Sequence, residues 1–368
     1  MLSFLLFCLA LASCADGFVR EAPTPSDLTV KKMVATTRNE AVTSNNYRVA
    51  TTIPNPDGKR VMDSWQFKVL DKLFSVPLFN FALFGIFRKQ MVTKAESMGI
   101  PWTDFLRDLN GQMSELLKIQ AAITDRSLET PAYYFAPIHA YKDGNLCWDS
   151  AMEEDLWSKL MIAPLFDNKR NGDVLMRRDW LDACRRNIAG AKVDSIVDLG
   201  CGTGLSLFMV QSMWPEAQLT GIDLSTFKLA IAQNKLQSKP FHVREKVTLV
   251  HGKAEDTSLP PNSFEFATIC LVNHESPKWV SEAIFKEAYR ILRPGGVFSI
   301  LDLDKDNLEI LLENPFVAAV YKQTEPYMSE YLSLNMPVAL GEAGFELLEI
   351  RSSSPSHLAL IARKPIDP

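Results

Sequence analysis

The sequence predicts an α/β fold with a doubly wound sheet, and two observations support this prediction. From residue 193 onward, short apolar segments of strand character alternate with segments of helical character up to the end of the chain. The first of these strands runs directly into "DLGCGTG" (198–204), where three glycines stand at alternate positions after a carboxylate. Such alternation is typical of a parallel sheet with crossover helices, and these sheets bind ligands at the turns that leave their strands.

The individual elements follow from the hydrophobic period and from the turn residues at their ends. Strands are predicted at 195–199, 217–223, 246–252, 264–272, 295–303, 345–350 and 358–363. Helices are predicted at 205–213, 226–236 and 279–292, and in further stretches between 307 and 343. Ahead of the sheet, apolar residues at helical spacing within 61–126 and 173–191 predict an N-terminal helical extension.

Composition and charge exclude some classes of partner. The chain has 368 residues, a net charge of -5 and no block rich in Lys and Arg. Because proteins that bind nucleic acid normally carry a basic face, nucleic acid is not expected as a partner. Cys147, Cys184, Cys201 and Cys270 are widely spaced, so neither a metal site nor a disulfide framework is predicted.

The N-terminal region predicts the cellular location of the protein. Residues 1–17 place an apolar run ahead of small residues, which is typical of a cleavable signal peptide. Residues 18–60 are rich in Ser, Thr and basic residues and resemble a transit peptide. Together they predict a plastid protein, with simple secretion as the alternative. The remaining chain divides into a helical or lid region, 61–155, and a sheet domain, 156–368.

Two aromatic segments allow two interpretations each. The run Phe74 to Phe87 is too short to span a bilayer, so it is either a core or lid helix or an interfacial segment in peripheral contact with a membrane. The loop 133–157 either covers a ligand or simply packs.

The glycine turn distinguishes between two cofactors. A dinucleotide fingerprint requires a third glycine at the position of Leu205, and the Asp198 carboxylate would repel a pyrophosphate. The same carboxylate favours the ammonium and sulfonium groups of S-adenosylmethionine. Asp223 ends the second strand, where a carboxylate can accept both ribose hydroxyls. S-adenosylmethionine is therefore the predicted cofactor, and a nicotinamide-dependent reductase is disfavoured.

Four stretches, "VDLGCGTG", "GIDLS", "GKAEDTSLPPNSFE" and "EAYRILRPGGVFSILD", resemble in this order the motifs of class I S-adenosylmethionine-dependent methyltransferases. The similarity is strongest to the type 11 branch, which contains the ubiquinone and menaquinone C-methyltransferases. "YYFAPIHAYKDGNLCW", "HESP" and "TEPYMSEY" also resemble uncharacterised plastid methyltransferase-like proteins of plants and algae. The resemblance implies a Rossmann-like seven-stranded sheet whose last strand is antiparallel.

The resemblance also implies a set of cofactor-binding residues. Asp198, Gly200 and Gly204 are expected to line the methionine moiety, and Asp223 to hold the ribose. Lys253 replaces the usual acidic residue near the adenine, so the adenine partner is sought among its neighbours. The full expected set is Asp198, Gly200, Cys201, Gly202, Gly204, Asp223, Leu224, Ala254, Glu255, Asp256 and Asn273.

The fourth predicted strand ends in "LVNHESP", beside the place expected for the transferable methyl group. His274 is the candidate general base and Glu275 the group that orients it; alternatively, both residues only cap the following helix. The aromatic segment 313–336 favours a lipophilic acceptor, such as a quinol or an isoprenoid-derived compound. The alternative function is a noncatalytic S-adenosylmethionine-binding protein with an assembly or regulatory role.

Overall fold

The computed structural model describes residues 64–188, 190 and 192–366, without the side chains of 77–84. The predicted signal peptide (1–17) and transit-like segment (18–60) lie outside the described residues, so both stay predictions.

A seven-stranded sheet forms the centre of the molecule, as the sequence predicts. Its strands are β1 (Ser195–Leu199), β2 (Gln218–Asp223), β3 (Val247–His251), β4 (Phe264–Cys270), β5 (Leu292–Leu303), β6 (Glu346–Ser354) and β7 (His357–Arg363). They are arranged in the order β3-β2-β1-β4-β5-β7-β6. The strands from β3 to β5 pair in parallel, and β7 is antiparallel to both β5 and β6, which confirms the expected fold class.

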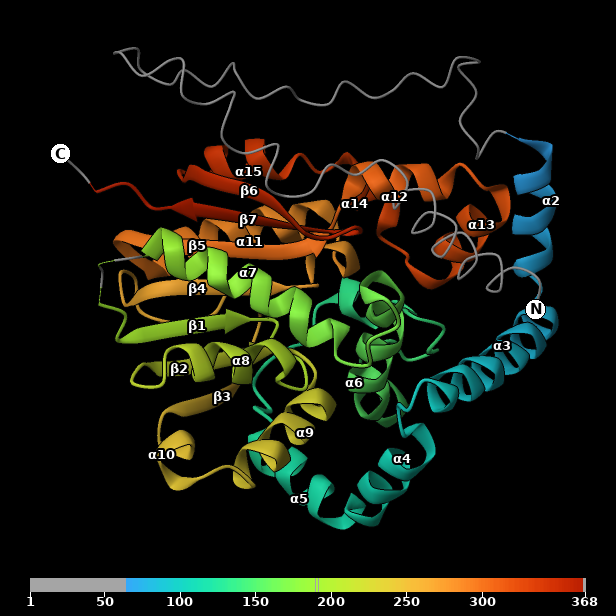
Figure 1. Cartoon of the computed structure of the whole chain (residues 1–368), viewed down its shortest axis with the longest axis horizontal. Coiled ribbons are helices and arrows are strands. Elements are labelled where there is room, and N and C mark those ends of the chain that lie inside the picture. Colours follow the sequence, from blue (N-terminus) through green and yellow to red (C-terminus); the bar gives the residue numbers. More distant parts are fainter. Residues whose placement is uncertain (1–63, 189, 191, 367–368) are drawn as a thin grey trace.

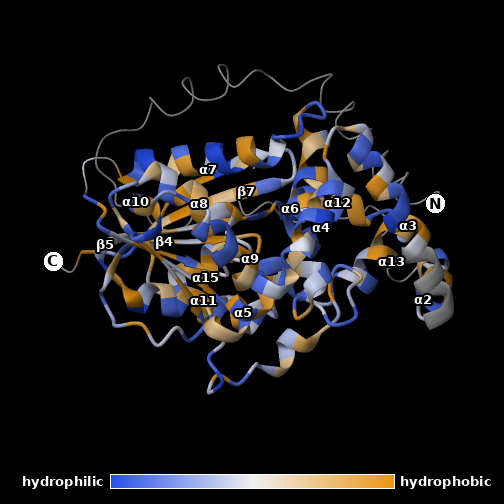
Figure 2. Ribbon diagram, turned by 90° about the horizontal axis from the view of Figure 1, so that it is seen from below, coloured by the Kyte–Doolittle hydropathy of each residue, from blue (hydrophilic) through white to orange (hydrophobic). Residues whose placement is uncertain are grey.

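Helices cover both faces of this sheet because alternate strand residues point to opposite sides. One face packs against α7 (Gly172–Ile188), α8 (Leu205–Met213) and α9 (Thr226–Gln237). The other packs against α11 (Lys278–Ile291), α14 (Met328–Ser333) and α15 (Met336–Glu342). In β1, Ile196 belongs to the first core, whereas Val197 and Leu199 belong to the second. Figure 2 shows the hydrophobic colour along the central strands and hydrophilic turns on the outer side of α7.

The order of the strands positions the functional site. The chain leaves β1 for β2 and β3 on one side and then returns to β4 on the other side of β1. In open α/β sheets, ligands bind outside the carboxyl ends of the strands at such a reversal. The site is therefore expected at the carboxyl ends of β1 and β4.

The N-terminal helices and the segment between β5 and β6 gather near these carboxyl ends (Figure 1). The N-terminal helices are α2 (Trp65–Phe74), α3 (Pro77–Ser97), α4 (Trp102–Gly111), α5 (Met113–Ile123) and α6 (Trp148–Ile162). The segment after β5 adds α12 (Lys305–Leu312) and α13 (Pro315–Thr324). Four short elements complete the described part of the chain: η2 (Ala132–Phe135), η3 (Ala163–Phe166), α10 (Phe241–Arg244) and η4 (Asn273–Glu275).

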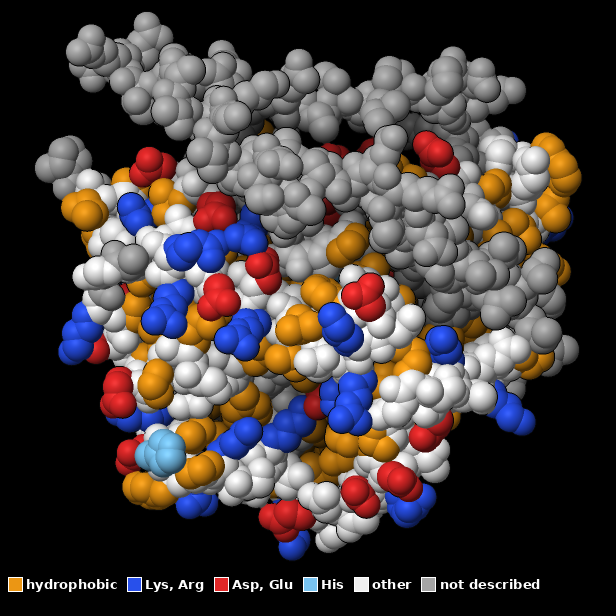
Figure 3. Space-filling view, in the orientation of Figure 1, with side chains coloured by type: hydrophobic (Ala, Val, Ile, Leu, Met, Phe, Trp, Pro, Cys, Tyr) orange, Lys and Arg blue, Asp and Glu red, His pale blue; other side chains and the backbone are white. Residues whose placement is uncertain are grey.

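The aromatic run 74–87 spans the end of α2 and the start of α3. Phe74 is 2% exposed and packs edge-on against Phe316 of α13, with ring centroids 5.4 Å apart. The opposite face of α2 exposes Trp65, Val69 and Leu73. Figure 3 shows hydrophobic side chains in orange at the upper right, where Figure 1 places α2. None of the described helices is long and apolar enough to cross a membrane.

Candidate functional site

The turn after β1 has the shape that its glycines predict. Gly200, Gly202 and Gly204 adopt positive φ angles of 71°, 53° and 87°. A Cβ atom on Gly200 would lie 2.6 Å from Val272, and one on Gly202 would lie 2.5 Å from the Glu154 carboxylate. Only glycine meets both demands, so the neighbouring side chains pack directly against the backbone of this turn, which ends at the start of α8.

Asp223 is held against this turn by two backbone N–H groups. Gly202 donates to its Oδ2 atom at 2.8 Å, and Ser225 donates to its Oδ1 atom at 2.7 Å. The hydroxyl of Tyr134 lies 3.4 Å from Oδ1. Asp223 therefore lies at the edge of the glycine turn, and its contact with the ribose stays a prediction.

Asp198 lies behind the turn and is 1% exposed. Thr268 donates a hydrogen bond to its Oδ1 atom at 2.7 Å. Burial raises the pKa of Asp198 to about 7, and the neighbouring Asp223 adds to this rise while the Thr268 hydrogen bond opposes it. The charge of Asp198 thus depends on pH in the neutral range.

One cavity of about 1320 Å³ extends from the glycine turn to the helices after β5. The predicted site residues in its wall are Gly200, Cys201, Gly202, Asp223, Leu224, Ala254, Glu255, His274 and Glu275. The other four predicted residues, Asp198, Gly204, Asp256 and Asn273, are not among the residues that line it. Asp256 is exposed and Asn273 is fully buried. Most of the predicted cofactor residues therefore share a single space.

Two residues of the wall, Tyr133 and Glu154, come from the segment 133–157, for which the sequence allows either covering a ligand or simple packing. Tyr133 of η2 donates to Glu255 Oε1 at 2.8 Å, so the aromatic loop lies over the third strand's end. Glu154 of α6 accepts the N–H of Thr203 at 3.0 Å and pairs with Lys228 at 2.9 Å. These contacts join the predicted lid region to the sheet domain, and α6 runs unbroken across the boundary predicted at 155.

His274 and Glu275 lie on η4, directly after β4. The Nδ1 atom of His274 lies 2.6 Å from Oδ1 of Asp302. Burial lowers the pKa of His274, but the carboxylates of Asp302 and Glu275 outweigh this effect and raise the pKa to about 9. Neither residue caps α11, whose N-cap is Pro277 with no side-chain hydrogen bond, so the capping interpretation is wrong.

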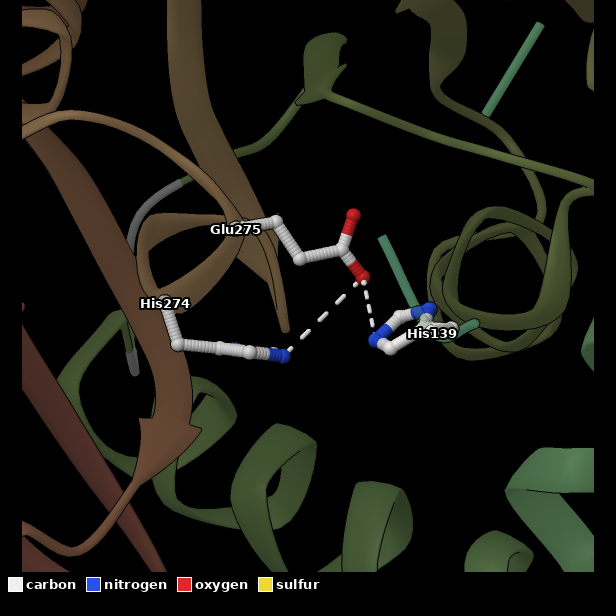
Figure 4. Close-up of side chains that lie close together, drawn as sticks. All are labelled: His139, His274 and Glu275. Carbon is white, nitrogen blue, oxygen red and sulfur yellow. Dashed lines mark ion pairs between the residues drawn. The ribbon is translucent and has the colours of Figure 1, made fainter. Parts of the chain in front are cut away.

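Two further titratable residues reach the same place from other parts of the chain. The Nε2 atom of His139 lies 3.4 Å from Glu275 Oε1 and 3.2 Å from Glu325 Oε1. Figure 4 shows His139 and His274 approaching the Glu275 carboxylate from different segments. Burial raises the pKa of Glu325 to about 6, against the opposing influence of His139 and His274. We call His139, His274, Glu275 and Glu325 the junction cluster.

Comparison with known proteins identifies part of this fold. Residues 196–296 match the family described as methyltransferase domain, which spans β1 to the start of β5 and includes the glycine turn. The demethylmenaquinone methyltransferase of Listeria welshimeri is 31% identical over 151 residues, covering 40% of this chain and 61% of that protein. Residues 196–296 therefore form a methyltransferase domain, within the fold of the class I S-adenosylmethionine-dependent type.

Two further similarities are also partial. The demethylmenaquinone methyltransferase of Geobacillus stearothermophilus is 26% identical and covers 38% of this chain and 59% of that protein. The structure of phosphoethanolamine N-methyltransferase 2 from Haemonchus contortus has a TM-score of 0.39 and 16% identity, covering 51% of this chain and 52% of that one. The chain thus spans about 60% of the length of these curated relatives. Its cofactor is S-adenosylmethionine.

Proposed function

We propose that the chain transfers the methyl group of S-adenosylmethionine to a small lipophilic acceptor with an ionisable oxygen, such as a quinol or an isoprenoid-derived compound. The observation that carries this proposal is the single cavity that joins the cofactor turn to an apolar wall. Pockets for one drug-sized ligand usually measure roughly 300–1,000 Å³. At about 1320 Å³, this cavity has room for the cofactor and a second molecule together.

The far wall of the cavity suits an apolar chain. It is formed by side chains of α12, α13 and the stretch around η3, namely Leu308, Leu311, Phe316, Val317, Met161 and Leu165. Each buried methylene group contributes roughly 0.8 kcal/mol, so a prenyl chain of even one or two units would bind appreciably there.

The segment 313–336 forms part of this wall, although not with all the aromatic residues expected of it. Tyr321, Tyr327 and Met328 line the cavity. Tyr331 instead is fully buried in the core and donates its hydroxyl to the Leu303 carbonyl at 2.5 Å. Part of the segment therefore lines the cavity, and Tyr331 fixes the segment to the core.

The junction cluster lies between the cofactor turn and the apolar wall. Its members all line the cavity, as do Gly200 of the turn and Val317 of the wall. A head group with an ionisable oxygen would meet these polar side chains while its tail lies among apolar ones. Methyl transfer needs the acceptor, methyl and sulfur in line, and such positioning contributes roughly 7–11 kcal/mol. We propose that His274 and Glu275 hold the acceptor's oxygen there.

The relatives support the quinol class. Both curated relatives carry the name demethylmenaquinone methyltransferase, which describes methyl transfer to a prenylated ring. An acceptor of this kind fits the cavity, because its ring would meet the junction cluster and its prenyl tail would lie along the apolar wall.

The exposed face of α2 supports access from a lipid surface. Trp65, Val69 and Leu73 are 71%, 58% and 42% exposed and recur at intervals of four residues, so they lie on one side of the helix. Lys68 and Lys72 stand exposed beside them. An apolar face with flanking cations fits an anionic membrane surface, and α2 packs on α13, whose side chains line the cavity.

A panel of acceptors tests the proposed function. The full-length chain is incubated with S-adenosylmethionine and reduced naphthoquinols or benzoquinols, each with and without a prenyl chain, and products are identified by mass spectrometry. We expect prenylated quinols to be methylated with a kcat/KM at least about tenfold above their tail-less forms. Asp223→Ala should abolish cofactor binding and turnover. Methylation of water-soluble amines or acids in preference to quinols would contradict the proposal.

A further inference from the structure

We infer that the junction cluster is a binding site for one divalent transition-metal ion, with Zn²⁺ as the best fit to its donor atoms. Three of these atoms, one each from His139, His274 and Glu275, lie within 4.8 Å of one another (Figure 4). Outside this group of three, Glu325 Oε1 lies 3.2 Å from His139 Nε2 and adds a second carboxylate beside it. Imidazole nitrogens and carboxylate oxygens together are a common ligand set for Zn²⁺.

The spacing of the donors fits ligands that share an ion. The Glu275 Oε1 atom lies 3.4 Å from His139 Nε2 and 3.9 Å from His274 Nε2. These separations exceed the usual 2.7–3.2 Å, roughly, of a hydrogen bond. Bonds from nitrogen or oxygen to Zn²⁺ measure about 2.0–2.2 Å, so two ligands of a tetrahedral ion stand roughly 3.3–3.6 Å apart. The observed distances lie close to that range.

Outer hydrogen bonds orient two of the proposed ligands. Asp302 holds the Nδ1 atom of His274 at 2.6 Å, which turns the Nε2 atom towards Glu275. Asn145 donates from Nδ2 to Glu275 Oε2 at 2.8 Å, which leaves Oε1 to face the two histidines. Ligating histidines in metal sites almost always donate their other ring N–H to a carboxylate or carbonyl in this way.

Glu325 supplies an independent observation. The residue is 9% exposed, and its Oε2 atom is buried without a hydrogen-bond partner among the described residues. A buried carboxylate oxygen without a partner is costly unless a cation compensates it. A divalent ion would compensate both Glu275 and Glu325.

The place of the site indicates what the ion would do. All four side chains line the cavity between the cofactor turn and the apolar wall. Metal sites with a position left open to a cavity bind substrate there and polarise its oxygen. The ion would therefore bind the acceptor's oxygen, and His274 would act as a ligand. That part of the inference rests on the proposed function, whereas binding of the ion itself does not.

Metal binding can be measured without any turnover. The full-length chain is stripped with a chelator and titrated with Zn²⁺ by calorimetry and with Co²⁺ by visible absorption, which reports the ligand field. We expect one ion per chain and at least about tenfold weaker binding in His139→Asn and in Glu275→Gln. His139 has a φ of 52°, and Asn tolerates this conformation well, so the first variant should fold. The matched controls are His242→Asn and Glu313→Gln, both at exposed positions, and should bind like the wild type.

Failure of the inference and failure of the proposed function give different results. No bound ion, or an ion whose affinity is unchanged in both variants while their thermal unfolding stays normal, would overturn the metal site. S-adenosylmethionine binding is measured on the same stripped sample. Cofactor binding and quinol methylation without an ion would leave the proposed function intact and remove this inference. An ion bound as expected, in a sample that does not bind the cofactor, would support the metal site and contradict the proposed function.

Discussion

The Nδ1 atom of His274 lies 2.6 Å from the Oδ1 atom of Asp302, a buried carboxylate on the central strand β5. The other oxygen of Asp302 accepts the N–H of Asn273 at 2.9 Å, so one side chain fixes both the η4 backbone and the imidazole ring. Burial acts to raise the pKa of Asp302, but His274 outweighs it and keeps the pKa below its usual value. Asp302 is thus an ionised positioning residue for the junction cluster.

Asp302→Asn should lower the rate of methyl transfer while leaving cofactor binding intact. The amide removes the charge that holds the His274 ring, and loss of such an outer partner typically costs about 10–100-fold in activity. We expect kcat to fall by that factor and the dissociation constant for S-adenosylmethionine to change less than about twofold. A loss of cofactor affinity as large as the loss of kcat would indicate a merely structural role.

Affinity for S-adenosylmethionine should weaken as the pH falls below neutral. The pKa of Asp198 is raised to about 7, so this carboxylate is ionised above that pH and protonated below it. The cationic cofactor favours the ionised form; therefore the affinity should fall between pH 8 and pH 6. The other charged groups that act on Asp198 are Asp223 and Arg177. Calorimetric titrations across this range check the prediction, and Asp198→Asn should show weak binding with little pH dependence. Equal affinity of the wild type for S-adenosylmethionine at pH 8 and at pH 6 would contradict the prediction.

Gly200→Ala should destabilise the fold and weaken cofactor binding together. The residue has a φ of 71°, and an added Cβ would meet Val272 at 2.6 Å. A left-handed conformation alone costs an alanine about 1–2 kcal/mol. Urea denaturation and cofactor titration measure the two effects. Gly341→Ala is the matched control, because no atom lies within 4 Å of its added Cβ, and it should keep wild-type affinity. Unchanged stability and affinity in Gly200→Ala would show that the turn does not need its glycine.

Removal of the α2 apolar face should reduce binding to anionic vesicles. Burying an apolar side chain of this size contributes roughly 1.5–3 kcal/mol, so Trp65→Ser with Val69→Ser should lower vesicle partitioning at least about tenfold. Sedimentation with vesicles of anionic phospholipid measures it. Phe241→Ser is the control, since Phe241 is 69% exposed on the distant helix α10. An equal loss of vesicle binding in both variants would mean that any exposed apolar residue contributes, wherever it lies, and would contradict a specific role for α2.

The fold could be predicted from the sequence because each strand and helix carries its own local pattern. The helix predicted at 205–213 has the same bounds as α8, since the glycine turn and the following apolar residues define both its ends. The antiparallel last strand followed from the family resemblance and is confirmed by the pairing of β7. The plastid location stays a prediction, because residues 1–63 lie outside the described part of the chain.

The site could be predicted only in part. The residues predicted to bind the cofactor lie in turns that directly follow strands. There, a single sequence motif identifies several of them together. The junction cluster joins a loop before the sheet, η4 and the end of α13, so His139 and Glu325 share no spacing with His274. Only tertiary packing brings the residues of the junction cluster together. Closely spaced ligand motifs in the sequence therefore could not identify this group.

The central claim, methyl transfer to a lipophilic acceptor, is tested most directly by following a labelled methyl group. The full-length chain is incubated with methyl-labelled S-adenosylmethionine and a plastid extract, and the label is partitioned between organic and aqueous phases. The account predicts label in the organic phase with the wild type and none with Asp223→Ala. Label in water-soluble metabolites or protein, or no label although the cofactor binds, would contradict it.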